Sequence, residues 1–327
     1  MTKSTLGSTP IELPKLSVGG RHHFLQEGVQ EPLWIWPEAP AKRVSLMGIL
    51  NVTPDSFFDG GRFHSHQEFE LVERATSQGL RLMDEGALYL DIGGESSRPG
   101  AEQISLDEEL SRVIPVIENL IAERPECIIS IDTIKPKVAE AALDVGARII
   151  NDIQGLRDPK MRALVAERRA GVVIMHMRGT PKTMQEGNLH SEDIVQETYQ
   201  WLETQYKLAI DEGICDEQIA IDLGIGFGKT VAQNLTLIRA LSRFKSISAH
   251  LLVGASRKSF IGAITGVSAD ERLPGSLVTI TEAMNFGGNI FRVHDVASSR
   301  QALMVAESIR QGSIAAPPIH IDELIRY

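Results

Sequence analysis

Short apolar runs alternate with longer amphipathic segments along most of the chain. Eight runs are candidate strands, each of only four to seven residues. They are Val44–Leu50, Leu88–Ile92, Cys127–Ile131, Arg148–Asn151, Gly171–Met175, Ile219–Asp222, His250–Gly254 and Asn289–Val293. Because strands that alternate with helical segments are typical of repeated βα units, this order predicts an α/β fold, a closed (β/α)8 TIM barrel.

The segments between these runs carry apolar residues at helical spacing. One predicted helical face comprises Phe69, Val72, Thr76, Leu80 and Met83, and a second comprises Leu106, Leu110, Val113, Ile117 and Leu120. Gly86 and Gly146 stand where helices should end. Residues 191–212 form the longest helical pattern, and its expected packing residues are Trp201, Leu202, Tyr206 and Leu208.

The ends of the chain differ from this repeating pattern. Residues 1–42 are rich in Pro, Gly and polar residues and form a predicted N-terminal extension. Their one apolar stretch, Leu33–Trp36, could be a short hairpin strand or a plug. Residues 43–312 contain no linker, repeat or low-complexity tract, so we expect a single barrel domain followed by a C-terminal tail at 313–327.

Composition narrows the class of protein. Of the 327 residues, 43% are hydrophobic and 23% are charged, as in a soluble globular domain. No apolar run approaches the length of a membrane span, and the start resembles no secretory signal, so a cytoplasmic location is expected. The net charge of −10 argues against nonspecific nucleic-acid binding. Cys127 and Cys215 are far apart, which argues against a disulfide framework or a metal cluster.

The stretch Asp222–Thr230 combines a carboxylate at the end of an apolar run with three alternating glycines. A phosphate-binding P-loop would need glycine where Leu223 stands, and a dinucleotide fingerprint would need it where Lys229 stands. Glycines at alternate positions allow close approach of the backbone to a ligand. We therefore expect a flat or phosphorylated ligand that neither motif describes.

Polar residues follow every predicted strand, and in a barrel the strand ends line one mouth. In chain order they are Asn51 and Asp55; Asp91, Glu95, Ser97 and Arg98; Asp132; Asn151 and Asp152; His176 and Arg178; Asp222; Ser256 and Lys258; and Arg292 and His294. An acid, an amide and an acid can bind the donor and acceptor edge of a pterin-like or purine-like ring. Several basic groups on one rim favour a phosphate or pyrophosphate.

Single members of this set also fit structural roles. Asp, Asn and Ser are common helix caps, Asp91 could pair with a basic group below the mouth, and His176 could be a satisfied structural histidine. No nucleophile elbow and no zinc-ligand cluster is present. Magnesium is plausible because it binds through few protein oxygens together with substrate phosphates.

The motifs resemble those of the dihydropteroate synthases. Met47–Phe57 and Asp91–Ala101 are similar to the first two signatures of that family. The later matches are Ile131–Thr133, Asn151–Ile153, Asp222–Lys229, Ser256–Ser259 and Arg292–His294. The resemblance implies condensation of 6-hydroxymethyl-7,8-dihydropterin diphosphate with 4-aminobenzoate, with magnesium assisting the departure of diphosphate along an SN1-like path.

The resemblance also implies a role for each matched residue. It places the pterin among Asp132, Asn151, Asp222, Lys258, Met175 and Phe227, and the diphosphate at Asn51, Arg98, Arg292 and His294. It gives Asn51 the magnesium ion, and it places the aminobenzoate among Ser97, Pro99, Ser256, Lys258 and Phe57. The implied catalytic residues are Asp55, Arg98, Asp132 and Lys258. A homodimer and sensitivity to sulfonamides are further family expectations.

Two departures and two rival interpretations accompany this resemblance. Leu223 stands where Pro is common in the family and Ser97 where Thr is common, which bears on loop rigidity and sulfonamide sensitivity. The first rival is a noncatalytic pterin-binding relative, which would have little need for the basic loop residues. The second is a methyltransferase-type pterin barrel. The same basic residues argue against it, because the ligand of such a barrel has no diphosphate.

Overall fold

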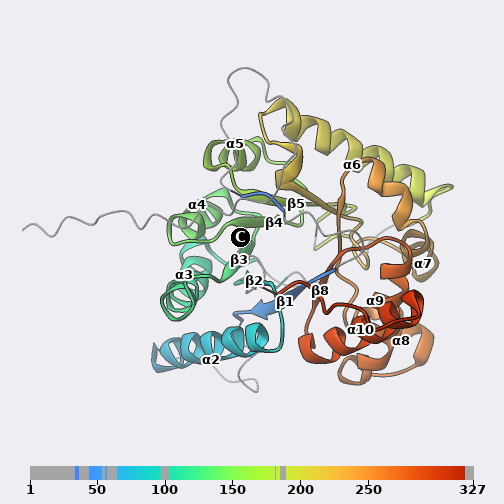
Figure 1. The fold of residues 1–327 in the computed structure, drawn as a ribbon. Coiled ribbons are helices and arrows are strands. Elements are labelled where there is room, and N and C mark those ends of the chain that lie inside the picture. The colour runs from blue at the N-terminus through green and yellow to red at the C-terminus, as the bar shows by residue number, and fades with distance from the viewer. Residues whose placement is uncertain are drawn as a thin grey trace, which may run out of the picture.

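Eight parallel strands close into a barrel in the order of the sequence, and helices surround it (Figure 1). The computed structural model describes residues 34–36, 44–53, 56, 65–96, 103–180, 182–184 and 189–320. The strands are β1 (Ser45–Asn51), β2 (Tyr89–Gly93), β3 (Ile128–Asp132), β4 (Ile149–Asp152), β5 (Gly171–Met175), β6 (Ile219–Asp222), β7 (His250–Val253) and β8 (Ile290–Val293). The predicted (β/α)8 TIM barrel is confirmed.

The observed strands match the apolar runs, but the first four are shifted forward. The cause is that polar residues at the strand ends still join the backbone ladder. Asn51 pairs with Gly93, Gly93 with Asp132, and Asp132 with Asn151. Their backbones belong to the sheet, while the side chains of Asn51, Asp132 and Asn151 lie at the mouth, so a boundary drawn on hydrophobicity alone ends too early.

Helices follow the strands around the barrel. They are α2 (Ser65–Asp84), α3 (Leu106–Glu123), α4 (Pro136–Asp144), α5 (Pro159–Arg168), α6 (Ile194–Asp211), α7 (Val231–Arg239), α8 (Ser259–Thr265), α9 (Leu273–Asn285) and α10 (Val296–Gln311). Gly86 and Gly146 follow α2 and α4 with φ of 108° and 112°, which confirms them as helix stops. None of the helices in the described part of the chain has the length and apolar character that a membrane crossing needs.

Some predicted packing residues are exposed. At α6, Leu202 is buried and Trp201 and Tyr206 pack against the core, but Leu208 is 39% exposed. Leu208 comes six residues after Leu202, which places it about 120° away around the helix. Phe69 near the start of α2 is 69% exposed, and α2, with 20 residues, is longer than α6, with 18.

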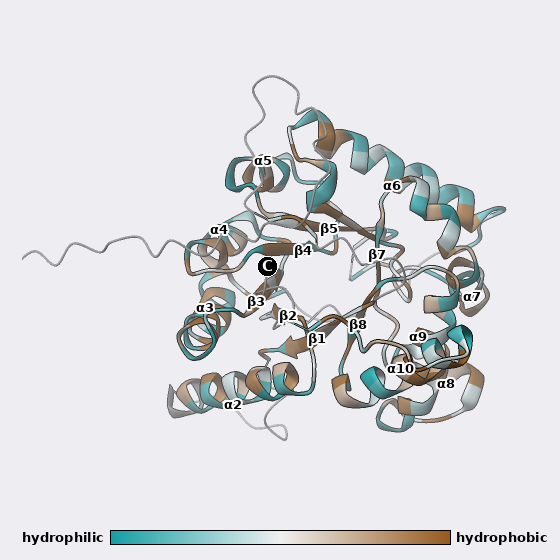
Figure 2. Ribbon diagram, viewed as in Figure 1, coloured by the Kyte–Doolittle hydropathy of each residue, from teal (hydrophilic) through white to brown (hydrophobic). Residues whose placement is uncertain are grey.

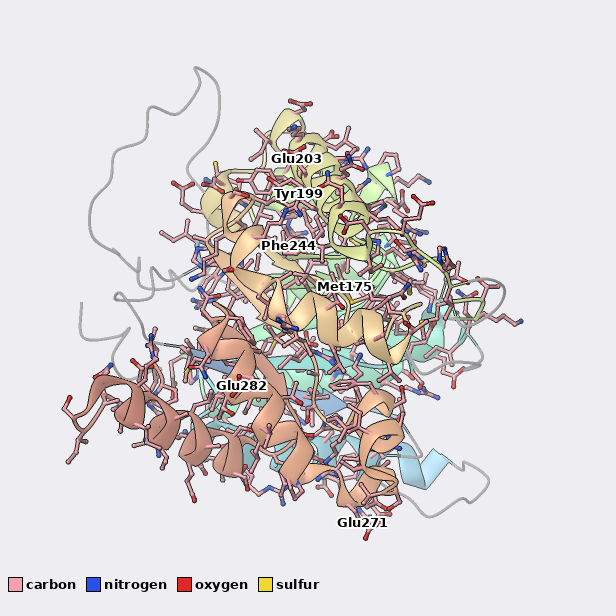
Figure 3. The ribbon with its side chains drawn as sticks, turned by 90° about the vertical axis from the view of Figure 1, so that its right-hand side faces the viewer. Met175, Tyr199, Glu203, Phe244, Glu271 and Glu282 are labelled. Atoms are coloured by element: carbon pink, nitrogen blue, oxygen red, sulfur yellow. The ribbon has the colours of Figure 1, made fainter. Side chains whose placement is uncertain are left out.

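The main hydrophobic core lies between the barrel and its helices, which turn their apolar residues toward the strands (Figure 2). On α6, for example, Tyr199 lies beside Phe244 of the 3-10 helix Leu241–Ser246, with ring centroids 5.8 Å apart (Figure 3). Burial of this kind contributes about 25 cal/mol for each Å² of apolar surface removed from water. The core therefore supplies a rigid frame for the strand ends.

A second cluster fills the barrel interior at the end where the strands begin. Trp34 and Trp36 belong to it, and the Trp36 ring meets Tyr89 edge-on at a centroid distance of 5.3 Å. The Trp36 indole N–H donates to the carbonyl oxygen of Gln218 (2.9 Å). A Cβ on Gly171 would lie 2.1 Å from Trp34, so only glycine fits there. Residues 34–36 have no regular secondary structure and plug this end of the barrel.

The described residues 34–36 thus behave as the plug and not as a strand. The proposed division at residues 42 and 312 stays a prediction, because much of the N-terminal segment and residues 321–327 lie outside the described ranges.

Candidate active site

Inward-facing positions along the strands change from apolar to polar toward the C-terminal mouth. A strand alternates its side chains between two faces, so Tyr89 of β2 lies in the bottom cluster and Asp91 lies one layer above it. The same alternation in β8 follows Ile290 with Arg292. The layer above the plug is therefore charged, and it forms the floor of the mouth.

Arg292 is the centre of this charged layer. Its Nε donates to Asp91 Oδ2, and its Nη2 donates to Asp132 Oδ2 at 2.7 Å. Asp91 is fully buried and also accepts hydrogen bonds from Ser130 Oγ (2.6 Å) and Asn151 Nδ2 (3.0 Å). Although burial lowers it, the pKa of Arg292 is raised by the two carboxylates. The network joins β2, β3, β4 and β8, and of the two roles left open for Asp91 the pairing with a basic group is observed.

The three groups expected to bind a ring edge all lie at this mouth. Asn151 is 4% exposed and Asp222 is 6% exposed, and the Asp132 side chain is 12% exposed. Burial raises the pKa of Asp132, which Arg292 lowers and Asp91 raises. Burial also raises the pKa of Asp222, which is opposed by a hydrogen bond from the Gly224 N–H. N–H donors from a ligand would stabilise the ionised form of both carboxylates and so oppose the effect of burial.

An apolar wall stands beside these polar groups. Phe227 packs with Ile153, Met175, Met177 and Met184. The Lys258 ammonium lies 3.9 Å from the centroid of the Phe227 ring, a cation–π contact. Burial lowers the pKa of Lys258 to about 8, while Asp222 raises it. A flat heterocycle would find one apolar face and one polar edge here.

Ser256 and His294 come together from the ends of β7 and β8. His294 Nδ1 lies 3.1 Å from Ser256 Oγ. Burial and the nearby Arg292 lower the pKa of His294 to about 4, so its imidazole is neutral at neutral pH. His294 therefore offers a neutral hydrogen-bonding group instead of the positive charge expected from the sequence. Arg257, the next residue after Ser256, forms a bidentate pair with Asp295, the next residue after His294 (2.9 and 2.6 Å).

Asn51 ends β1 at the same mouth and is partly exposed. Its amide oxygen is a ligand type that magnesium accepts, and one protein oxygen suffices where substrate phosphates and water complete the coordination. In the described part of the chain, no group of three His, Cys, Asp or Glu side chains could hold a metal by itself. The donor set thus fits a magnesium ion that arrives with a phosphorylated substrate.

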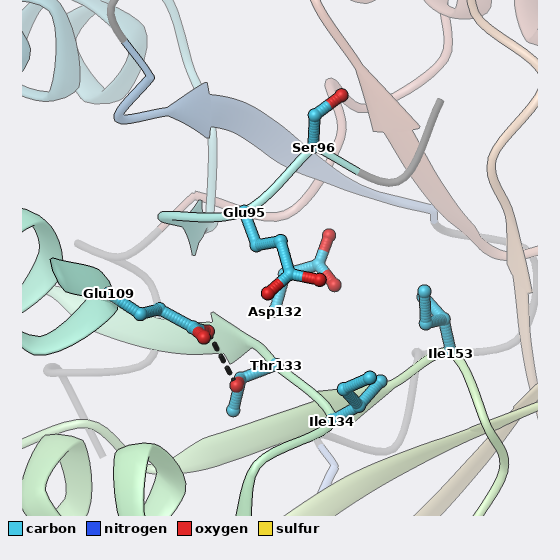
Figure 4. Close-up of a pocket in the computed structure, with 7 residues that line it drawn as sticks. All are labelled: Glu95, Ser96, Glu109, Asp132, Thr133, Ile134 and Ile153. Carbon is cyan, nitrogen blue, oxygen red and sulfur yellow. Dashed lines mark hydrogen bonds between the residues drawn. The ribbon is translucent and has the colours of Figure 1, made fainter. Parts of the chain in front are cut away.

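A small pocket opens beside Asp132 (Figure 4). Its lining residues are Glu95, Ser96, Glu109, Asp132, Thr133, Ile134 and Ile153. Lys135 pairs with both Glu95 and Glu109, and Thr133 Oγ1 donates to Glu109 Oε1 at 2.6 Å. Glu109 is one of three acids at the start of α3, yet it is 1% exposed and packs in this wall of the mouth.

Several predicted site residues lie outside the described ranges. They are Asp55, Phe57, Ser97, Arg98 and Pro99. Their implied roles in catalysis, in diphosphate binding and in the aminobenzoate pocket stay predictions. The predicted site residues that the structure describes, from Asn51 to His294, all lie at the C-terminal ends of strands or in the loops that follow them.

His176 has a structural environment. It is 3% exposed, and its ring meets Trp201 edge-on at 5.2 Å. Burial and neighbouring cations lower its pKa strongly, so it stays neutral. Lys229, which sequence reasoning noted only for breaking a fingerprint, is 4% exposed and lies in the same region.

Comparison with known proteins gives this geometry a family. The sequence model of the family described as pterin binding enzyme matches residues 47–294 of this chain, from the first signature motif to His294. The dihydropteroate synthase of Synechocystis is 44% identical over 283 residues, which cover 86% of this chain and 94% of that protein. The chain belongs to the dihydropteroate synthase family. The predicted resemblance is confirmed, as is the predicted enzyme class, a pterin-binding transferase of folate biosynthesis.

Solved structures of dihydropteroate synthases share the fold. That of Xanthomonas albilineans with 4-aminobenzoic acid has a TM-score of 0.75 and 43% identity, and the alignment covers 82% of this chain and 93% of that one. The same enzyme in complex with 7,8-dihydropteroate has a TM-score of 0.72 and 41% identity, with 82% and 94% covered. All the described site residues of this dihydropteroate synthase family member lie within the matched range 47–294.

Proposed function

We propose that the chain condenses 6-hydroxymethyl-7,8-dihydropterin diphosphate with 4-aminobenzoate to give 7,8-dihydropteroate and pyrophosphate. The observation that supports this proposal most strongly is the position of Asp132, Asn151 and Asp222, which lie together at the C-terminal mouth of the barrel beside Arg292 and Lys258. The related Xanthomonas structures, titled with 4-aminobenzoic acid and with 7,8-dihydropteroate, support the same substrate class.

The pterin ring would lie against the apolar wall with its polar edge toward the acid–amide–acid set. Asp132 and Asp222 would accept the ring N–H groups, and Asn151 can both donate and accept. Met175 and Phe227 would contact the ring face. Lys258, held between Phe227 and Asp222, would donate to a ring acceptor while it is protonated. A site built to pair each ring atom would reject ligands that leave a buried carboxylate unpaired.

The diphosphate would lie above Arg292 and His294, next to Asn51. Two donor groups of Arg292 are taken by Asp91 and Asp132, which leaves Nη1 for a phosphate oxygen. Neutral His294 would donate through Nε2, since its Nδ1 faces Ser256. Asn51 would hold magnesium, which when bound neutralises charge on the diphosphate, and Arg98 would approach from its loop. The aminobenzoate would lie near Ser256, Lys258, Ser97, Pro99 and Phe57.

The reaction needs no protein nucleophile. The C–O bond between the pterin methylene and the diphosphate breaks, and the electron pair leaves with the diphosphate. Arg292 favours this step because its charge is fixed before the reaction. Burial raises the pKa of Asp132 and Asp222, and in their ionised forms these two carboxylates would stabilise the positive charge left on the pterin. The aminobenzoate nitrogen then attacks the methylene and passes its proton to the released pyrophosphate or to water. We infer an SN1-like path in which Asp55 and Arg98 act together with Asp132 and Lys258.

The competing function is a noncatalytic pterin-binding relative. The test is the release of pyrophosphate by the purified chain from the pterin diphosphate and magnesium, with and without 4-aminobenzoate. Release that depends on the amine supports the synthase. Pterin binding measured by calorimetry without any release would overturn the proposal and favour the binding protein.

Three further expectations concern the oligomeric state, the location in the cell and the response to sulfonamides. A homodimer through the late helices fits the large apolar residues exposed there, which include Val278 (63%), Val305 (59%) and Ile309 (76%). Sedimentation would show a mass of about twice 35.9 kDa. A cytoplasmic location and sensitivity to sulfonamides stay predictions.

A further inference from the structure

Lys229 lies deep in the loop between β6 and α7, where it is 4% exposed. The loop winds around it through three glycines in the left-handed region, Gly224, Gly226 and Gly228, with φ of 65°, 86° and 65°. A buried lysine charge is costly unless all of its N–H groups are satisfied. The contacts of its ammonium group therefore need an explanation.

The Lys229 ammonium donates to three main-chain carbonyl oxygens. They belong to Gly224 (2.9 Å), Phe227 (3.0 Å) and His176 (3.2 Å). An ammonium has three donors and no acceptor, so the three carbonyls use its full capacity. In the described part of the chain, its hydrogen-bond acceptors are carbonyls and not carboxylates. The side chain occupies its carbonyl cage much as a bound cation would.

The cage joins two loops that the sheet itself no longer holds together. The last backbone bond between β5 and β6 runs from the His176 N–H to the Asp222 carbonyl at 2.9 Å. Beyond it, Gly224 passes so close to His176 that a Cβ would lie 1.9 Å from the carbonyl oxygen. Lys229 binds the carbonyls on both sides of this contact. It continues the pairing of the two strand ends where the ladder stops.

One of the three carbonyls that bind Lys229 belongs to Phe227, whose ring makes the cation–π contact with Lys258. We propose that Lys229 is a positioning residue of the pterin site: its ammonium ties the loops after β5 and β6 and thereby holds the Phe227 ring against Lys258. The inference rests on the proposed function for the identity of the ligand. It assigns Lys229 no contact with substrate, so its effect reaches the ligand only through Phe227 and Lys258.

The test compares Lys229→Met with a matched variant at the other end of the same strand. Methionine keeps much of the side-chain volume but removes all three donors. Gln218→Met is the control, because Gln218 is 2% exposed and also satisfies main-chain groups, donating to the Ala170 carbonyl (2.6 Å) and accepting from the Cys215 N–H (3.0 Å). Both variants lose buried hydrogen bonds, but only Lys229 lies at the mouth.

Steady-state kinetics and calorimetric binding of the pterin diphosphate give the readout. We expect Lys229→Met to raise KM and the dissociation constant for the pterin diphosphate about tenfold, the loss that one misplaced buried contact produces. The KM for 4-aminobenzoate should change by less than about threefold, because a lost contact to the pterin raises the KM of the pterin substrate and not that of the amine. Gln218→Met should lower the urea midpoint and leave both KM values within about twofold.

Two results would overturn the inference. One is an unchanged affinity for the pterin diphosphate in Lys229→Met, and the other is an equal change in Gln218→Met. Should Lys229→Met fail to fold, Lys229→Gln, which keeps two donors, carries the same comparison with a smaller expected shift. Calorimetry does not need turnover, so a wild-type chain that binds pterin but forms no product refutes the proposed function and leaves the Lys229 comparison intact.

Discussion

The Asp91→Asn substitution tests whether the charged layer under the mouth is held together as described. Asp91 is fully buried and accepts hydrogen bonds from Ser130, Asn151 and Arg292. Asparagine has nearly the same shape, but it loses the charge opposite Arg292. Its amide nitrogen can face Ser130, whose hydroxyl would then accept instead of donate, so the main loss is the charge opposite Arg292.

The magnitude follows from these contacts. Breaking a buried ion pair by removing one partner costs about 3–5 kcal/mol. Arg292 keeps Asp132 as a second carboxylate at 2.7 Å, so we expect the lower end of that range, about 3 kcal/mol. The more exposed pair of Arg257 and Asp295 has side chains that are 32% and 21% exposed. Removing it by Asp295→Asn should cost about 1 kcal/mol or less.

The assay is urea unfolding followed by the fluorescence of the three tryptophans. Asp91→Asn should unfold at a clearly lower urea concentration than Asp295→Asn. It should also raise the KM for the pterin diphosphate, since Arg292 loses the group that orients it. Equal stability of the two variants would refute the view that Asp91 stabilises the fold through this network more than Asp295 does through its pair with Arg257.

The remaining predictions concern the plug, a buried histidine and Lys258. Gly171→Ala should destabilise the fold by about 2 kcal/mol by overpacking against Trp34, and much less in a Trp34→Leu background, as a double-mutant cycle would measure. Burial lowers the pKa of His250 to about 4. Because the folded state then binds fewer protons than the unfolded state, stability should fall as pH drops from about 6.5 toward 4. In His250→Gln, the urea midpoint plotted against pH should be flatter over that range. With the pKa of Lys258 lowered to about 8, kcat/KM should decline as pH rises through about 8, and Lys258→Arg should move that decline to higher pH; a decline left in place would separate it from Lys258.

The sequence predicts the strand ends to within one residue, because most of the apolar runs stop at or next to a polar residue. Asn51, Asp132 and Asp222 were recognisable for that reason, and all three end strands at the mouth. The sequence could not show which side chains meet there. Arg292 and Asp91 are 201 positions apart, and only closure of the barrel through β1 brings them together.

Other features escaped for different physical reasons. The acceptors of Lys229 are main-chain carbonyls, which every residue has, so no residue type marks the cage. Glu109 is one of three acids at the start of α3, where acids are ordinary, and only the fold shows that it pairs with Lys135 of the loop after β3. The glycines after Asp222 were expected to admit a ligand, yet Gly224 is required by the protein's own His176 carbonyl.

The most direct test of the central claim is product formation by the purified chain. The chain would be incubated with the pterin diphosphate, 4-aminobenzoate and magnesium, and dihydropteroate and pyrophosphate would be quantified together by mass spectrometry and a coupled assay. The account predicts the two products in equal amounts, with turnover strongly reduced in Asp222→Asn. Absence of dihydropteroate from a folded, pterin-binding chain would contradict it.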